Sequence, residues 1–124
     1  MRTVLVIDDS DLIRAVAKLA LGRQEGWEVI CAESGAEGLD LAHRNQPDAV
    51  LLDVVMPGFD GPDTCKRLRE DDATREIPVI FLTAQSDEAE LARLAELDVA
   101  GVIAKPFEPA GLAAQVSALL GWNL

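Results

Sequence analysis

The stretch AVLLDVVMPG, residues 49–58, decides the fold of this chain. It starts with a short apolar run that has the length and composition of a buried strand. The run ends in a carboxylate, Asp53, and a turn containing proline and glycine follows at once. Four other apolar runs of similar length occur, and three of them also stop at residues able to bind phosphate or a divalent cation: Asp8 with Asp9, Thr83, and Lys105.

Apolar runs alternate with helical patterns along the whole sequence. The predicted strands are 3–7, 27–32, 48–52, 79–82 and 100–104. Helix starts are indicated by Ser10 or Asp11, by the Ser34 and Glu37 capping box, by Gly61-Pro62, by Asp87 with Glu90, and by Pro109. Strands joined through helices by short loops imply right-handed crossovers and parallel pairing. The predicted fold is therefore α/β, a doubly wound five-stranded parallel sheet with five helices, which is a flavodoxin-like three-layer sandwich.

All strands of a parallel sheet end at the same edge, and open α/β sheets bind their ligands there. The side chains of Asp8, Asp9, Asp53, Thr83 and Lys105 are therefore expected to converge. Three neighbouring carboxylates repel one another unless a cation is bound. Mg²⁺, or Mn²⁺ with similar ligands, fits such a site because it takes a few carboxylates, waters and a phosphate oxygen. Lys105 adds a positive charge and Thr83 a hydroxyl, so a carboxylate held there can act as a nucleophile that forms an acyl phosphate.

Size and charge exclude several other classes of protein. The 124 residues are enough for one ordinary domain, predicted to span residues 1–124. Eleven basic and twenty-two acidic residues give a net charge of −11, which argues against direct nucleic-acid or membrane-surface binding. Cys31 and Cys65 have no metal-binding spacing, and we interpret them as buried thiols of a reducing compartment. With neither a signal peptide nor a membrane span in the sequence, the predicted location is cytoplasmic.

Several polar and aromatic residues have ordinary structural explanations. Each carboxylate taken alone is as well explained by a turn or cap as by function, and only the joint occurrence at four strand ends favours a site. The basic run Lys66, Arg67 and Arg69 is interpreted as the solvated face of a helix. His43, Trp27 and Trp122 are treated as structural or surface residues.

Four fragments, in order and at the family's spacing, resemble the receiver domain of bacterial two-component response regulators, in particular the single-domain chemotaxis type. They are IDDS with Asp8 and Asp9, LLDVVMPGFDG with Asp53, IPVIFLTA with Thr83 and Ala84, and AKPF with Lys105. The resemblance covers essentially the whole chain. It implies a signalling switch, with only its own autophosphorylation and autodephosphorylation chemistry, and not a metabolic enzyme.

The resemblance implies a role for each site residue. Asp53 would accept a phosphoryl group from a phosphohistidine of a sensor kinase or phosphotransfer protein. Asp9, Asp53 and the carbonyl of Val55 would hold the metal, with Asp8 acting directly or through water. Thr83, Lys105 and the N–H groups of Val55 and Ala84 would bind the phosphoryl group, and the Lys105-Pro106 bond would be cis. An output protein or domain would be a further partner, and the fourth and fifth helices could form a homodimer.

Two positions depart from the family pattern. Val102 stands where the family often has an aromatic residue that moves with Thr83. Asp98-Val99 replaces a frequent Gly-Ala, and Asp98 is expected to tolerate the left-handed conformation of a helix terminus. Because of Val102, an alternative function stays open, in which the chain is a receiver-fold interaction module that works without phosphorylation. A haloacid-dehalogenase type of phosphohydrolase is disfavoured, because Val55 occupies the place of its second acid. Whether the chain acts alone or is a piece of a longer protein is not decided by the sequence.

Overall fold

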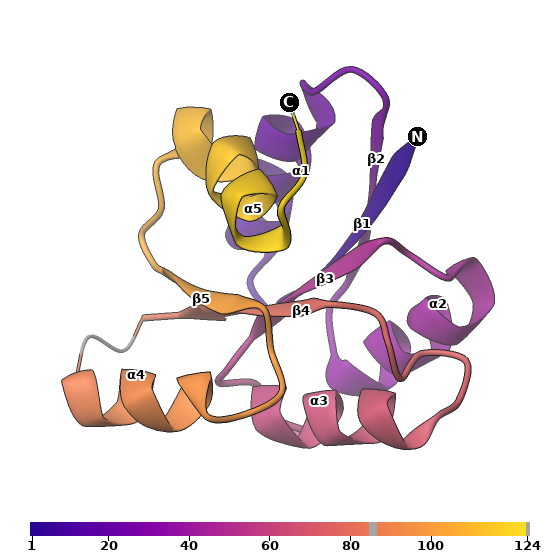
Figure 1. Ribbon diagram of the computed structural model, residues 1–124, viewed down its shortest axis with the longest axis vertical. Coiled ribbons are helices and arrows are strands. Elements are labelled where there is room, and N and C mark those ends of the chain that lie inside the picture. The colour runs from indigo at the N-terminus through magenta and orange to yellow at the C-terminus, as the bar shows by residue number, and fades with distance from the viewer. Residues whose placement is uncertain (85–86, 124) are drawn as a thin grey trace.

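The structure is a computed structural model, and it describes residues 1–84 and 87–123 (Figure 1). Strands and helices alternate along this part of the chain. The strands are β1 (Arg2–Ile7), β2 (Trp27–Ala32), β3 (Ala49–Asp53), β4 (Val79–Thr83) and β5 (Gly101–Ala104). The helices are α1 (Asp11–Gly22), α2 (Gly35–Asn45), α3 (Gly61–Glu70), α4 (Glu88–Ala95) and α5 (Leu112–Leu120), the last preceded by a 3₁₀ turn at Pro109–Gly111.

The strands form one parallel sheet in the order β2-β1-β3-β4-β5. Helices α1 and α5 lie on one face of this sheet, and α2, α3 and α4 lie on the other (Figure 1). The chain therefore has the doubly wound, three-layer fold that the sequence predicted. Within the described residues, none of the helices is long and apolar enough to cross a membrane.

The core is divided into two clusters by the sheet. One joins strand residues such as Val6 and Leu51 to Leu112 and Val116 of α5. The other joins Leu52 and Phe81 to helix residues on the opposite face. Strand side chains alternate between faces, and both faces are covered, so β3 and β4 are buried at every residue. Each fully buried large side chain stabilises the fold by about 1.5–3 kcal/mol.

Two site residues belong to their strands and do not follow them. Asp53 is the last residue of β3 and pairs with Leu82, and Thr83 is the last residue of β4 and pairs with Ala104. The sequence analysis placed both strand ends one residue earlier. A hydrophobic pattern stops at the first polar side chain, whereas the backbone pairing of the sheet continues through that residue. Strand membership fixes the backbone of both residues, so their side chains leave the sheet from rigid positions.

Three predicted helix starts are confirmed by side-chain caps, and α3 begins at Gly61 as expected. Pro109 begins only a 3₁₀ turn, and α5 starts later, at Leu112. Ser10 accepts a hydrogen bond from the Ile13 N–H, and Ser34 accepts one from the Glu37 N–H. Asp87 caps α4 in the same way through the Ala89 N–H. The expectation for Asp98 at a helix terminus is not met. The described backbone does not place Asp98 in the left-handed region, and the non-glycine residue found there is Gln46, with φ 47°, after α2.

The expectation that the basic run on α3 is solvated is correct for Lys66 and wrong for Arg69. Lys66 is exposed as expected, and the guanidinium of Arg67 stacks 4.0 Å from the ring centroid of Phe59. Arg69 is largely buried, and its guanidinium donates hydrogen bonds to three backbone carbonyls: Arg75 at 3.0 Å, Ile77 at 2.7 Å and Asp98 at 2.8 Å. The forked guanidinium has several donors in fixed directions, so one side chain ties the end of α3 to two later loops.

The two tryptophans form a cluster at the start of the sheet. Their ring centroids lie 5.4 Å apart at an interplanar angle of 89°, and the Arg2 guanidinium lies 4.2 Å from the Trp122 centroid. Trp27 is paired with Arg2, at the first position of both β2 and β1. The cluster therefore lies at the edge opposite to the one where Asp53 ends β3.

Candidate functional site

The predicted site residues converge at the carboxyl ends of the strands. Asp8 and Asp9 follow β1, Asp53 ends β3, Thr83 ends β4 and Lys105 follows β5. Parallel register brings these ends together, and the ladder continues past the strands through the Lys105 N–H, which donates to the Thr83 carbonyl at 2.8 Å. The Lys105-Pro106 peptide bond is cis, as expected.

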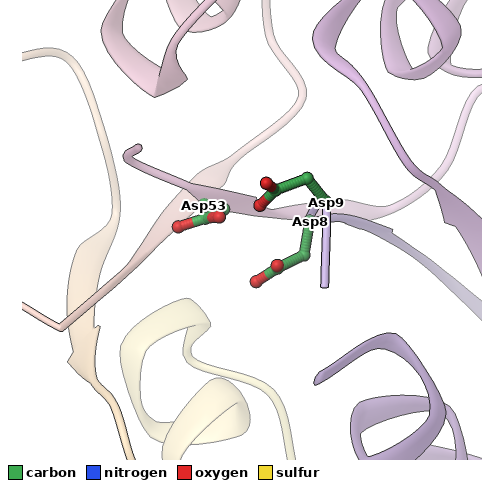
Figure 2. A group of neighbouring side chains, drawn as sticks. All are labelled: Asp8, Asp9 and Asp53. Atoms are coloured by element: carbon green, nitrogen blue, oxygen red, sulfur yellow. The ribbon is translucent and has the colours of Figure 1, made fainter. Parts of the chain in front are cut away.

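Three carboxylates form the centre of the site. The side chains of Asp8 and Asp9 leave consecutive positions and reach toward the side where Asp53 lies (Figure 2). One oxygen from each of the three groups lies within 4.8 Å of the others. Asp8 is fully buried and Asp53 is 5% exposed, whereas Asp9 is exposed. Two acidic groups are thus held away from water, and the third opens the cluster to solvent.

Lys105 joins two of the carboxylates. Its ammonium lies 2.8 Å from Asp8 Oδ2 and 3.1 Å from Asp53 Oδ1, to which it donates a hydrogen bond. The contact with Asp8 is an ion pair that lacks hydrogen-bond alignment, and Asp8 Oδ2 has no hydrogen-bond partner among the described residues. One cation facing three carboxylates leaves excess negative charge at the site.

Burial and neighbouring charges shift the pKa values of Asp53 and Lys105. Burial raises the pKa of Asp53 from 3.8 to about 6, the hydrogen bond from Lys105 opposes this rise, and the charge of Asp8 adds to it. Burial alone would lower the pKa of Lys105, but the carboxylates of Asp8 and Asp53 outweigh it, and that pKa is raised. Near neutral pH, Lys105 is therefore an ammonium ion and Asp53 is mostly a carboxylate, available as a nucleophile.

A pocket of about 390 Å³ opens beside Asp53. Its lining consists of Asp53, Val55, Thr83, Ala84 and Lys105. Val55 is 66% exposed and Ala84 is also exposed, so the pocket is open to an incoming group. It combines a carboxylate, an ammonium, a hydroxyl and two loop backbones, which are the groups needed to receive and hold a phosphoryl group. Val55 carries no carboxyl group to serve as a second acid.

The acidic cluster also fits a divalent cation. Mg²⁺ prefers one or two carboxylates together with waters and a phosphate oxygen, and Asp9 offers a carboxylate that solvent can reach. The excess negative charge and the Asp8 oxygen without a hydrogen-bond partner are both features that a cation would satisfy. The residues present therefore match the chemistry of magnesium or manganese.

The loop after Asp53 is packed against the strand end. A Cβ at Gly61 would lie 2.6 Å from the Asp53 carbonyl oxygen and 2.7 Å from Val54 Cα, contacts too short for any side chain. The Gly61 N–H donates to the Val54 carbonyl at 2.8 Å, and the Asp60 side chain caps α3 by accepting from the Asp63 N–H. The start of α3 thus sits directly on the backbone that carries Asp53.

Sequence reasoning missed two groups that hold the β1 end. The Ser10 N–H donates to Asp8 Oδ1 at 2.9 Å, so the residue predicted as a helix cap also fixes a site carboxylate. Arg14 of α1 donates to the Asp8 carbonyl at 2.7 Å. The position of Arg14, in the first turn of the helix that follows the aspartates, was a weak signal. Most arginines on helices extend into solvent, so spacing alone could not show that this one contacts the Asp8 backbone.

Comparison with known families assigns the chain. Residues 4–117 match the response regulator receiver domain, and the chain belongs to this family. Members are receiver domains of two-component systems and act as signalling switches, not as classical enzymes.

Two curated relatives are longer proteins that match this chain over part of their length. Transcriptional regulatory protein AfsQ1 of Streptomyces coelicolor is 38% identical over 97% of this chain, and CseB of Streptomyces avermitilis is 38% identical over 94%. The chain spans about half the length of these curated relatives, 52% and 48%.

Solved structures match over nearly their whole length. A putative response regulator from Chloroflexus aurantiacus is 39% identical with a TM-score of 0.86, the match covering 97% of this chain and 98% of that one. Chemotaxis protein CheY4 of Vibrio cholerae is 28% identical with a TM-score of 0.87, covering 96% and 98%.

Proposed function

We propose that residues 1–124 form one receiver domain that accepts a phosphoryl group on Asp53 and relays this event through a changed docking surface. The observation that carries the proposal is the pocket beside Asp53, whose lining contains the acceptor carboxylate, Lys105 and the Thr83 hydroxyl together. The donor would be a phosphohistidine of a sensor histidine kinase or of a histidine phosphotransfer protein. A cytoplasmic location, predicted from the sequence, belongs to the same proposal.

The transfer uses the residues already described. An Asp53 carboxylate oxygen attacks the phosphorus, the phosphorus–nitrogen bond of the donor breaks, and the imidazole leaves with that electron pair. Lys105 holds the carboxylate in place and balances charge on the phosphoryl oxygens. Thr83 and the N–H groups of Val55 and Ala84 bind those oxygens. Hydrolysis returns the carboxylate and releases inorganic phosphate, so the chain catalyses only its own modification and reset.

A divalent cation, Mg²⁺ or Mn²⁺, would neutralise the developing negative charge when bound. We assign its protein ligands to Asp9, Asp53 and the Val55 carbonyl, with Asp8 acting directly or through water. The support for this assignment is the approach of the three carboxylates to within 4.8 Å and the excess negative charge at the site.

The test is a phosphorylation reaction followed by intact-mass measurement. Incubation with Mg²⁺ and a small acyl-phosphate donor is expected to add one phosphoryl group to the wild-type chain and none to Asp53→Asn. Asp40→Asn, an exposed aspartate paired with Arg44 on α2, is the matched control and should be phosphorylated like wild type. Absence of the mass gain, or its persistence in Asp53→Asn, would contradict the assignment of Asp53.

The receiver would pass its signal to an output protein or domain, and α4 with α5 could form a homodimer. A second candidate function is an interaction module that recruits its partner without phosphorylation. The observation in its favour is Val102, which is half-buried opposite Phe81 and offers less surface to rearrange than an aromatic ring. Equal partner binding by wild type with and without a phosphoryl mimic would favour this second candidate.

A further inference from the structure

We infer that Arg14 is a positioning residue for the acidic cluster, because its guanidinium holds the carbonyl of Asp8 and thereby fixes the peptide that carries Asp9 toward Asp53. This inference rests on the cation-dependent function proposed above. It adds to that function a side chain on α1 that contacts neither the phosphoryl pocket nor the three carboxylate groups of the cluster.

The guanidinium of Arg14 is itself held by three segments. Its Nη1 donates to the Asp8 carbonyl oxygen at 2.7 Å, and its Nη2 pairs with the Asp11 carboxylate in the first turn of α1. Glu33, in the loop after β2, places a carboxylate oxygen 3.8 Å from the same Nη2. The Arg14 side chain is only 16% exposed. Its planar fork is thus fixed in direction, and a charged donor forms one of the stronger classes of hydrogen bond to a carbonyl.

Every polar group of Asp8 has a fixed neighbour. Its N–H donates to the Ala32 carbonyl at 3.1 Å, its Oδ1 accepts from the Ser10 N–H, and its Oδ2 pairs with Lys105. The carbonyl oxygen, held by Arg14, lies in the peptide plane shared with Asp9. Because Asp9 is exposed, the orientation of this peptide plane is what directs its carboxylate toward Asp53. Loss of the Arg14 bond would free that plane to rotate.

Simple electrostatics predicts the opposite effect for a substitution of Arg14. Removing a positive charge close to a cation site should tighten cation binding, although Asp11 and Glu33 already offset most of that charge. Removing a group that orients a metal ligand should weaken binding, by about tenfold at the lower end of the effects known for such groups. The sign of the change therefore separates a positioning role from a purely electrostatic one.

The experiment measures Mn²⁺ binding by electron paramagnetic resonance on the full chain. Wild type is compared with two variants. Arg14→Gln removes both the positive charge and the planar guanidinium, and Arg14→Lys keeps the charge but removes the guanidinium. Lys18→Gln removes the same charge one turn further along α1 and is the matched control. Urea unfolding without metal establishes that each variant is folded, and Arg14→Lys carries the test if Arg14→Gln is not.

We expect the Mn²⁺ dissociation constant to rise about tenfold in Arg14→Gln and also to rise in Arg14→Lys, with no rise in Lys18→Gln. The Mg²⁺ concentration that gives half the maximal rate of Asp53 phosphorylation should rise by a similar factor in both Arg14 variants and stay unchanged in Lys18→Gln. Unchanged or tighter Mn²⁺ binding in both Arg14 variants would overturn the inference while leaving the proposed function intact. A wild-type chain that binds no Mn²⁺ would overturn both.

Discussion

Two buried charged centres of this molecule are neutralised in different ways. The Arg69 guanidinium, under α3, donates to three backbone carbonyls and lies 3.4 Å from the Asp98 carboxylate. At the ends of the strands, one ammonium group faces three carboxylates, and Asp53 is left with a raised pKa. The first centre satisfies its charge with protein groups, and the second keeps a charge in excess.

This difference indicates what each centre contributes. A buried charge that is paired and hydrogen-bonded by its surroundings joins segments and stabilises them, whereas a buried charge in excess costs stability until a ligand arrives. Strain of this kind is common at functional sites. Neutralising Arg69 should therefore destabilise the fold, whereas neutralising Asp53 should stabilise it.

Arg69→Met should give the largest change. The substitution keeps an apolar stem but leaves the carbonyls of Arg75, Ile77 and Asp98 without their donor, so the free energy of unfolding should fall by about 3 kcal/mol. Urea unfolding checks this value. A loss no greater than that of Lys66→Met, an exposed position on the same helix, would show that the carbonyls find other partners.

Asp53→Asn should stabilise the fold when no divalent cation is present. The pKa rise from 3.8 to about 6 means that burying the ionised group costs the fold about 1–3 kcal/mol at pH 7, and a neutral amide avoids this cost. Urea unfolding in the presence of a chelator measures the gain. A destabilised Asp53→Asn would mean that the ion pair with Lys105 outweighs burial and like-charge repulsion.

The gain from Asp53→Asn should depend on pH. Between about pH 4 and pH 6 the folded state of wild type binds more protons at Asp53 than the unfolded state does, so wild-type stability falls as pH rises through this window. The difference between variant and wild type should therefore be close to zero near pH 4 and complete above about pH 6.5. Unfolding curves at several pH values test this, and a difference independent of pH would contradict the raised pKa.

Arg93→Gln should give the smallest change. Arg93 pairs with Glu90 on the surface of α4, outside both centres, and solvent screens such a pair. We expect no measurable shift of the urea midpoint. A clear loss of stability would show that exposed charges of this acidic chain matter as much as the buried centres.

Much of the fold follows from patterns that are local in sequence. Five apolar runs alternating with five helical patterns predicted the parallel sheet, because handedness and strand polarity leave few other arrangements. The convergence of Asp8, Asp53, Thr83 and Lys105 followed from the same rule, since it requires only that strands end at a common edge. The structure confirms this convergence.

The features that sequence reasoning missed depend on contacts between distant segments. Arg69 was expected to be solvated, and its true surroundings are set by Ile77 and Asp98, which the chain brings back under α3 only after folding. Arg14 contacts the Asp8 backbone carbonyl. Every residue has such a carbonyl, so a sequence pattern cannot show which one a side chain will contact. Gly61 touches the backbone of Asp53, so the reason for glycine there is visible only in three dimensions.

The tryptophan cluster has a spectroscopic consequence. The chain has no tyrosine, so its near-ultraviolet absorption and emission come almost entirely from Trp27 and Trp122, which touch each other and the Arg2 cation at the sheet edge far from Asp53. Emission should therefore change sharply when the rings separate on unfolding and stay nearly constant when metal or a phosphoryl group arrives. The chain thus carries an internal reporter of global unfolding that is insensitive to its own signalling event.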